Sequence, residues 1–292
     1  MIRINFQTIR LIATATVILA CLFTSGFCDE PAREFGVMAN SNNMRAIPVA
    51  DVAQAAGEIG YEYVALSCGA AQLAGQVQAF RDEGIEIGAI YVGWSTDGET
   101  VQFNIPIDEV FAHLEGTGGV VMIHTSIPGG EPVSDERIAE LMLPLAEKAE
   151  AAGLTIAIYP HVANRLETLA QATAVADLVD NPSLGVCFNL CHYLKQNDPE
   201  DLPDSLRAAA HRIKLTSING ADVGDTQSMG WERLIQQLNQ GDFDLEELLT
   251  LLCGELEFDG PFYVQCYNLK APSRTILQET WDRWQELRGC CE

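Results

Sequence analysis

The chain has 292 residues, with 17 basic and 41 acidic side chains, and 48% of its residues are hydrophobic. That hydrophobic share excludes an intrinsically disordered protein, and the length suffices for one barrel-sized domain or two ordinary domains. A formal net charge of −24 argues against nucleic acid and anionic membrane surfaces as partners, because both are bound through surplus lysine and arginine.

Residues 1–28 have the organisation of a secretory signal peptide. They carry two arginines and no acidic residue, then an apolar stretch over residues 11–23, and Gly26-Phe27-Cys28 fits a small-x-small cleavage site. The stretch is short for a membrane span, which takes about 20 residues. Two alternatives remain, a lipoprotein anchored at Cys21 and an uncleaved anchor. The sequence therefore predicts a secreted or periplasmic protein with no transmembrane domain in the mature chain.

Eight short apolar segments alternate with helical patterns along the rest of the chain. The predicted strands cover residues 35–39, 63–67, 85–92, 120–125, 154–159, 184–189, 212–218 and 262–267. Each is rich in Val, Ile, Leu, Ala or Tyr, as strands buried on both faces are. The predicted helices cover residues 49–58, 72–83, 107–115, 134–152, 166–179, 199–209, 245–256 and 273–287. The clearest helix has Ser134 as its N-cap and Gly153 directly after its end.

Eight strand–helix units over about 255 residues match a (β/α)8 barrel, whose usual size is about 250 residues. An open doubly wound sheet also alternates strands and helices. The first strand-to-helix turn, at residues 39–43, lacks the glycine-rich dinucleotide fingerprint of that fold. We therefore predict an α/β protein with a single (β/α)8 TIM barrel over residues 34–288. In such a barrel the functional residues lie at the C-terminal ends of the strands.

The predicted strand ends are unusually polar and aromatic. They carry Asn40, Ser67, Cys68, Trp94, His124, Tyr159, His161, Asn189, His192, Ser217, Asn219, Gln265 and Tyr267. A single histidine at a barrel rim is more often a hydrogen-bonded structural residue than a catalyst, but three on consecutive strands favour a site. Trp94, Trp231, Tyr159 and Tyr267 could stack on the apolar faces of a sugar, with core or rim packing as the alternative.

Three stretches in the second half of the chain resemble the xylose-isomerase-like TIM-barrel superfamily. They are residues 153–161 (GLTIAIYPH), residues 181–192 (NPSLGVCFNLCH), and a segment from Arg212 through Gly241-Asp-Phe-Asp244 to Gln265. They cover predicted strands five to eight, and the N-terminal half agrees in topology alone. This superfamily includes sugar isomerases, ketose 3-epimerases, hydroxypyruvate isomerase, inosose dehydratase and endonuclease IV. The resemblance implies a barrel that acts on a sugar or keto-sugar.

The family's usual metal ligands are missing. Its enzymes typically hold one divalent cation with Glu, Asp, His and Glu on strands five to eight. At those positions this sequence has Tyr159, Asn189, Ser217 and Gln265. Mg²⁺ and Mn²⁺ prefer anionic oxygen ligands, so a phenol and two amides in place of three carboxylates predict no metal and no other cofactor. The pocket then holds neutral hydrogen-bonding groups that suit sugar hydroxyls. A zinc site built from His124, His161 and His192 is the alternative.

Two functions fit these observations. The first is an isomerase, epimerase or related lyase that moves a proton next to a sugar carbonyl, with His161 or His192 as base and Tyr159 as acid. The predicted substrate-binding residues are Asn189, Ser217, Asn219, Gln265, His124, Trp94 and Tyr267. The second is a carbohydrate-binding barrel that has lost its chemistry. Endonuclease-like DNA repair is disfavoured by the charge, and the sequence specifies neither the sugar nor the oligomeric state.

The nine cysteines suggest no disulfide framework. Cys187 and Cys191 are expected to line the barrel interior as small apolar residues. Cys290 and Cys291 at the C-terminal end could pair with each other, stay free or link two chains.

Overall fold

The computed structural model describes residues 34–128 and 133–291. The predicted leader and Cys21 lie outside these residues, so secretion and lipidation stay predictions. No helix within the described residues has the length and apolar character to cross a membrane.

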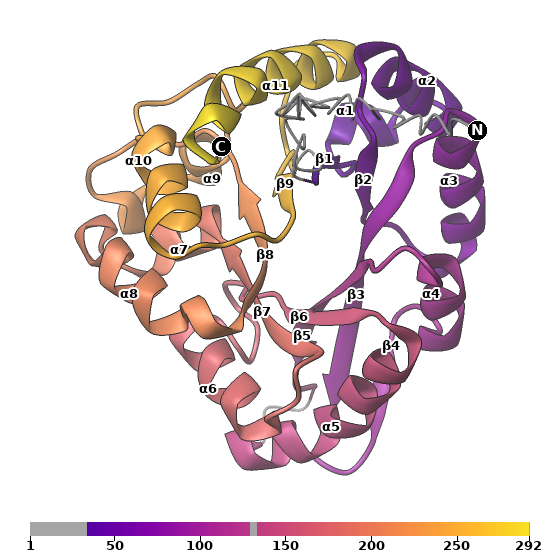
Figure 1. The fold of residues 1–292 in the computed structure, drawn as a ribbon, viewed down its shortest axis with the longest axis vertical. Coiled ribbons are helices and arrows are strands. Elements are labelled where there is room, and N and C mark those ends of the chain that lie inside the picture. The colour runs from indigo at the N-terminus through magenta and orange to yellow at the C-terminus, as the bar shows by residue number, and fades with distance from the viewer. Residues whose placement is uncertain (1–33, 129–132, 292) are drawn as a thin grey trace, which may run out of the picture. The chain divides into compact units, whose positions relative to one another are not determined.

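Eight parallel strands form a closed ring (Figure 1). They are β1 (Phe35–Met38), β2 (Tyr63–Leu66), β3 (Glu86–Thr96), β5 (Val120–Ser126), β6 (Thr155–Ile158), β7 (Leu184–Asn189), β8 (Ile213–Ile218) and β9 (Phe262–Val264). Each strand pairs with its predecessor in this series, and β9 pairs with β1, which closes the ring. This confirms the predicted (β/α)8 barrel, in which the strands end together at one rim.

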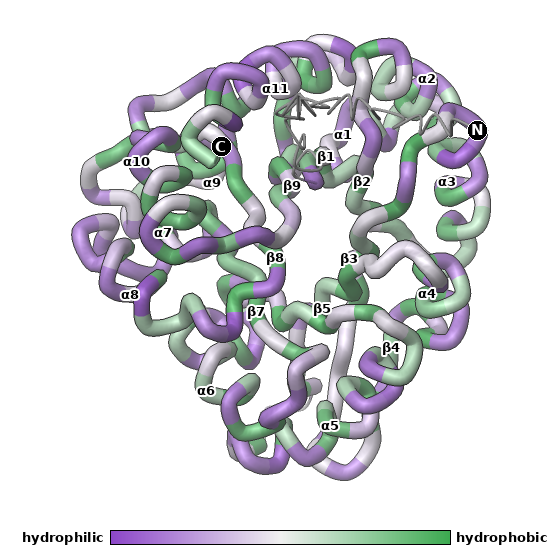
Figure 2. Tube along the Cα trace, viewed as in Figure 1, coloured by the Kyte–Doolittle hydropathy of each residue, from purple (hydrophilic) through white to green (hydrophobic). Residues whose placement is uncertain are grey.

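Helices surround the ring of strands. They are α1 (Asn42–Arg45), α2 (Val49–Ile59), α3 (Ala70–Asp82), α4 (Ile107–Leu114), α5 (Asp135–Ala152), α6 (Leu169–Val179), α7 (Leu190–Gln196), α8 (Leu202–Ala209), α9 (Trp231–Leu234), α10 (Leu245–Leu249) and α11 (Ser273–Leu287). As predicted, the Ser134 side chain caps α5 and Gly153 ends it with a φ of 66°. Figure 2 shows hydrophobic residues along the strands and alternating hydrophobic and hydrophilic residues along the helices.

The core has two parts, because successive residues of a strand point to opposite faces. One cluster, which includes Ala89 and Cys187, fills the barrel interior, and a larger one packs between strands and helices. Cys187 is a free, buried thiol of the inner cluster, as predicted. The placement predicted for Cys191 is wrong. The chain leaves β7 at Asn189 and turns into α7, so Cys191 packs in the outer cluster.

Strand β3 is longer than predicted. It continues to Thr96 and forms an antiparallel hairpin with β4 (Val101–Phe103). Trp94 lies in this extension, points the same way as Ile90 and Val92, and is fully buried in the outer cluster. The prediction that Trp94 binds substrate is therefore wrong, because its strand direction turns the indole away from the barrel axis.

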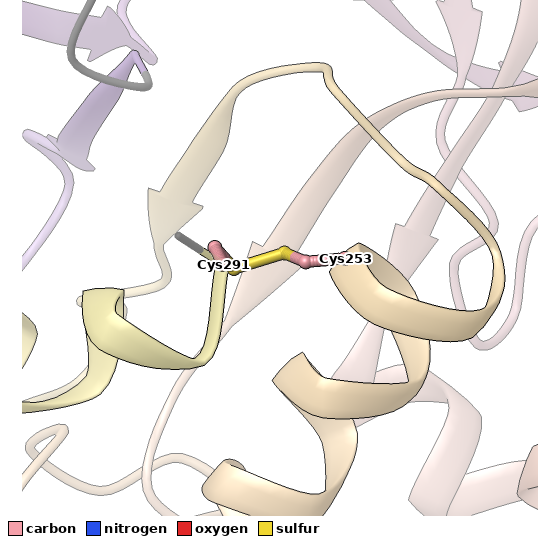
Figure 3. Close-up of a disulfide and its surroundings, with 2 residues drawn as sticks. All are labelled: Cys253 and Cys291. Carbon is pink, nitrogen blue, oxygen red and sulfur yellow. A yellow bond between two sulfur atoms is a disulfide. The ribbon is translucent and has the colours of Figure 1, made fainter. Parts of the chain in front are cut away.

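A disulfide joins Cys253 to Cys291 (Figure 3). Cys253 lies in a π-helical segment, Thr250–Glu255, directly after α10, and Cys291 ends the described chain. None of the three arrangements expected for Cys290 and Cys291 included this pairing. Sequence spacing gave no sign of it, because the two cysteines are 38 residues apart and meet only through the packing of α10 and α11.

Candidate functional site

A cavity of about 520 Å³ lies at the C-terminal ends of the strands, and we call it the inner pocket. Its walls are mostly aromatic, imidazole and amide groups. The lining residues are Met38, Asn40, Arg45, Ser67, Tyr91, Tyr159, His161, Val162, Ala163, His192, Trp231, Ile235, Gln265 and Tyr267. No acidic side chain is among the described lining residues, and Arg45 is the one charged residue there.

Two histidines are linked through the main chain of one residue, Val162. His161 follows β6, His192 lies in the first turn of α7, and their ring centroids are 4.0 Å apart. The His161 Nδ1 is 2.7 Å from the carbonyl oxygen of Val162. The backbone N–H of Val162 donates to His192 Nδ1 over 3.1 Å. Residue 162 therefore contacts both rings through its main chain.

These two bonds fix opposite tautomers in the neutral rings. A carbonyl oxygen can only accept, so His161 donates from Nδ1 and its Nε2 keeps a free lone pair. An amide N–H can only donate, so His192 accepts at Nδ1 and carries its proton on Nε2. One imidazole of the pair can thus accept a proton or hydrogen bond at Nε2, and the other can donate one.

Burial keeps both rings neutral. Desolvation lowers the pKa of His192 well below its usual value, and the nearby His161 lowers it further. Desolvation also lowers the pKa of His161, although its bond to the Val162 carbonyl acts in the opposite direction. The neutral form of His161 is the one that can take a proton from a substrate.

A chain of hydrogen bonds forms one side of the pocket. The Asn40 Nδ2 donates to Gln265 Oε1 over 2.7 Å, and Gln265 Nε2 donates to the Tyr159 hydroxyl over 3.0 Å. The backbone N–H of Tyr267 donates to the same Gln265 oxygen over 2.9 Å. Burial raises the pKa of Tyr159 well above its usual range, so its phenol stays protonated. Asn40 Oδ1 is buried and has no partner among the described residues.

Asn189 and Ser217 support this site and do not line it. They are paired neighbours on β7 and β8, and both are buried. Asn189 Nδ2 donates to the Pro160 carbonyl over 3.3 Å, and its Oδ1 accepts from Cys191 Sγ over 3.3 Å. Ser217 is hydrogen-bonded to Tyr159. The prediction of direct substrate contact is wrong for both, because these side chains lie beside or beneath the residues that face the cavity.

The four residues at the family's ligand positions do not fit a hard divalent cation. The oxygens of Asn189 and Gln265 already accept hydrogen bonds, and the Tyr159 phenol is protonated. A cation of this kind needs anionic or free neutral oxygens directed at one point. Within residues 34–128 and 133–291, no group of three or more His, Cys, Asp or Glu side chains is placed to hold a metal. The alternative zinc site of His124, His161 and His192 is therefore not formed among these residues.

Two other predicted contact residues do not line the inner pocket. Asn219 is fully buried and donates to the carbonyls of Gly220 and Leu234 over 2.8 and 2.7 Å, which ties the loop after β8 to α9. His124 is not among the residues that line the inner pocket. It stacks on Tyr91, with ring centroids 4.8 Å apart and planes 10° apart. Burial and the neighbouring His161 lower its pKa to about 4.

The remaining predicted residues lie in the pocket, together with some that sequence reasoning missed. Tyr159, His161, His192, Gln265 and Tyr267 line it, as does Trp231, whose ring centroid is 5.0 Å from that of His192. Tyr91 and Arg45 were missed. Strand alternation could have revealed Tyr91, which has the same parity as the inward-facing Ala89. Arg45 lies on α1, beyond the end of its strand, and Val162 acts through its main chain. The sequence therefore did not identify either residue as part of the site.

Comparison with known proteins agrees with this fold. The family model described as xylose isomerase-like TIM barrel matches residues 34–287. The IolI protein with a bound zinc atom has a TM-score of 0.65 and 14% identity, over 87% of this chain and 97% of that one. A D-psicose 3-epimerase with D-tagatose, from Clostridium cellulolyticum H10, has a TM-score of 0.62 and 13% identity, over 89% and 99%.

A fusion of a xylose isomerase-like TIM barrel with a 4-hydroxyphenylpyruvate dioxygenase gives a TM-score of 0.64 and 16% identity. The match covers 89% of this chain and 43% of the fusion protein, so the chain spans less than half of that relative. No curated protein sequence matches the chain. At these identities the structural likeness establishes the fold alone. Because the family model covers nearly all of the barrel, the chain belongs to the xylose isomerase-like TIM barrel family.

Proposed function

We propose that this protein is a secreted isomerase or epimerase that moves a proton next to the carbonyl of a sugar or keto-sugar without a divalent metal. One observation carries the proposal, namely the opposite tautomers that the main chain of Val162 imposes on His161 and His192. Proton transfer beside a carbonyl needs a base for the carbon and a donor for the oxygen. The solved structures of sugar 3-epimerases with the same fold support this class of substrate.

The two histidines have separate tasks. His161 Nε2 takes the proton from the carbon beside the carbonyl, the C–H electron pair becomes the new C=C bond, and the carbonyl π pair moves to oxygen. His192 Nε2–H donates to that oxygen as negative charge develops there. The hydroxyl on the deprotonated carbon then passes its proton to the enediolate oxygen and its O–H electron pair forms the new C=O. The C=C pair takes the proton back from His161 at the former carbonyl carbon, which gives the isomer. The Tyr159 phenol and the exposed ring of Tyr267 bind the rest of the sugar.

Exchange of substrate protons with solvent tests this proposal. NMR in D₂O with a panel of ketoses and aldoses should show deuterium entering at the carbon next to the carbonyl. His161→Ala should reduce this exchange by about 10²–10⁴-fold, the usual contribution of a general base. His211→Ala is the matched control, because that exposed imidazole pairs with Asp177, does not line the pocket and should leave exchange unchanged.

Two results would contradict the proposal. If His161→Ala exchanges as fast as the unaltered protein, the base assignment fails. If the folded protein binds sugars and exchanges none of them, it is a carbohydrate-binding barrel without chemistry. Elemental analysis addresses the metal separately, since one tightly held divalent ion per chain, with exchange abolished by EDTA, would overturn the metal-free mechanism.

A further inference from the structure

A second cavity adjoins the inner pocket. It has a volume of about 690 Å³, lies between the α1–α2 region and α3, and is here called the outer pocket. Arg45, Ser67 and Tyr91 line both cavities, which places them at the junction. Each volume falls in the range of about 300–1,000 Å³ that is usual for a complete small-molecule site. The two together have room for more than one sugar unit.

Arg45 is the one charged residue among the described residues that line these two cavities, where both histidines are neutral. Its guanidinium donates to the Ser67 carbonyl over 3.2 Å and is exposed. No carboxylate of the described residues pairs with it, whereas Arg207 and Arg212 each pair with two. In a chain with 41 acidic side chains, a carboxylate-free wall around one unpaired cation selects for an anionic ligand.

Amide side chains also line the outer pocket. They belong to Gln72, Gln76 and Asn104. The oxygens of Gln72 and Asn104 accept backbone hydrogen bonds, whereas the Gln76 Oε1 atom is buried with no partner among the described residues. A buried acceptor without a partner is unfavourable, and rotation of the Gln76 amide towards a ligand hydroxyl would satisfy it. Amide groups of this kind suit sugar hydroxyls, so the chemistry of the outer pocket matches a second sugar unit.

We propose, building on the function proposed above, that the substrate is an acidic saccharide of at least two units. The sugar that reacts lies against His161 and His192 in the inner pocket. A carboxylate of the saccharide, as in a uronic acid, binds Arg45 at the junction, and the second unit occupies the outer pocket. The carboxylate fits because guanidinium and carboxylate form paired, charge-assisted hydrogen bonds.

Calorimetric titration with matched ligands tests the charge. The probes are a uronate-containing disaccharide, its uncharged methyl ester, the uronate monosaccharide and a hexose 6-phosphate. The free acid should bind about tenfold more tightly than its ester, and Arg45→Gln should remove this difference. Arg81→Gln is the matched control, because Arg81 is also exposed and also donates to a backbone carbonyl, that of His113. If acid and ester bind equally well, Arg45 does not bind a carboxylate of the ligand. The same conclusion follows if the hexose 6-phosphate binds more tightly than the uronate and does so through Arg45.

Filling the outer pocket tests the second unit. A Cβ built on Gly75 of α3 meets nothing within 4 Å, so Gly75→Phe enters the cavity without disturbing the fold. It should weaken disaccharide binding at least tenfold and leave uronate monosaccharide binding unchanged. Ala74→Phe is the control, because this neighbour on the same helix is exposed and lines neither pocket. Unchanged disaccharide binding by Gly75→Phe overturns the two-unit substrate.

The exchange assay separates this inference from the proposed function. If the protein prefers the acid through Arg45 but catalyses no deuterium exchange, the proposed isomerase activity is wrong and the proposed ligand class stands. If neutral monosaccharides exchange equally well and the protein does not prefer the acid, the proposal of an acidic substrate is wrong and the proposed isomerase activity stands.

Discussion

Gln265 shows how a single residue organises the site. Its side-chain oxygen accepts from Asn40 and from the Tyr267 backbone, while its nitrogen donates to Tyr159. The family's glutamate at this position would bring a charge into the same buried space. The amide instead links the ends of the barrel's first, fifth and eighth strands in one neutral network.

Removal of this link should cost stability. Gln265→Ala leaves the Asn40 amide and the Tyr159 hydroxyl buried with one partner fewer, so the free energy of unfolding should fall by about 1–3 kcal/mol. Urea denaturation measures this change. Gln78→Ala, which removes an exposed bond to Asp82, should have almost no effect. Equal stability of Gln265→Ala and the unaltered protein would show that the network contributes nothing.

The buried ring of His124 predicts a loss of stability in acid. Its pKa is about 4 in the folded chain, against about 6.5 for an unperturbed histidine. The unfolded chain therefore binds the proton first, and stability is lost as the pH falls from about 6.5 towards 4. In thermal melts across this pH range, the melting temperature of His124→Phe should decline less than that of the unaltered protein. Parallel pH profiles for the two proteins would rule out this contribution.

Strand positions were predictable from the sequence, whereas strand orientation was not. Each barrel strand is a short apolar run, so its place along the chain was evident and all eight were found. A strand buried on both faces does not show which face meets the axis. That is why Trp94 was placed in the site and Tyr91 was not. The rim residues Tyr159, His161 and His192 were predictable because they follow their strands directly.

Strands β7 and β8 approach each other closely at Gly185, so a larger residue at this position should destabilise the barrel. A Cβ at Gly185 would lie 2.1 Å from the Arg212 carbonyl oxygen, which belongs to the backbone and cannot rotate away. Gly185→Ala should therefore lower the free energy of unfolding by about 1–3 kcal/mol. Gly254→Ala is the control, because a Cβ there meets open space. A neutral Gly185→Ala in chemical denaturation would mean that the two strands separate at little cost.

At the scale of the molecule, the C-terminal segment completes the barrel. Trp284 of α11 stacks on Phe35 of β1, with ring centroids 4.2 Å apart and planes 4° apart. The Cys253–Cys291 disulfide holds the end of this segment to the turn after α10. The first barrel strand is thus packed under the last helix. No acidic side chain is among the described residues that line either pocket.

The disulfide should stabilise the whole domain. Closing a loop of 38 residues restricts the unfolded chain by roughly 4 kcal/mol in the loop-entropy model. Reduction, or Cys253→Ser, should lower the unfolding midpoint accordingly in a denaturant titration. Cys290→Ser leaves the bond in place and should melt like the unaltered protein. If reduction leaves the midpoint unchanged, the cross-link has no role in stability.

The main-chain bonds of Val162 to the two histidines have a consequence for how such a site can change over time. The polarity of the histidine pair depends on a carbonyl and an N–H that nearly every amino acid supplies, so the side chain at position 162 is free to vary. Proline is the exception, since it has no N–H to offer His192. The next residue, Ala163, holds a left-handed φ of 69° that fixes the loop. The polarity of the histidine pair is therefore encoded in loop shape, where a comparison of side chains alone would not find it.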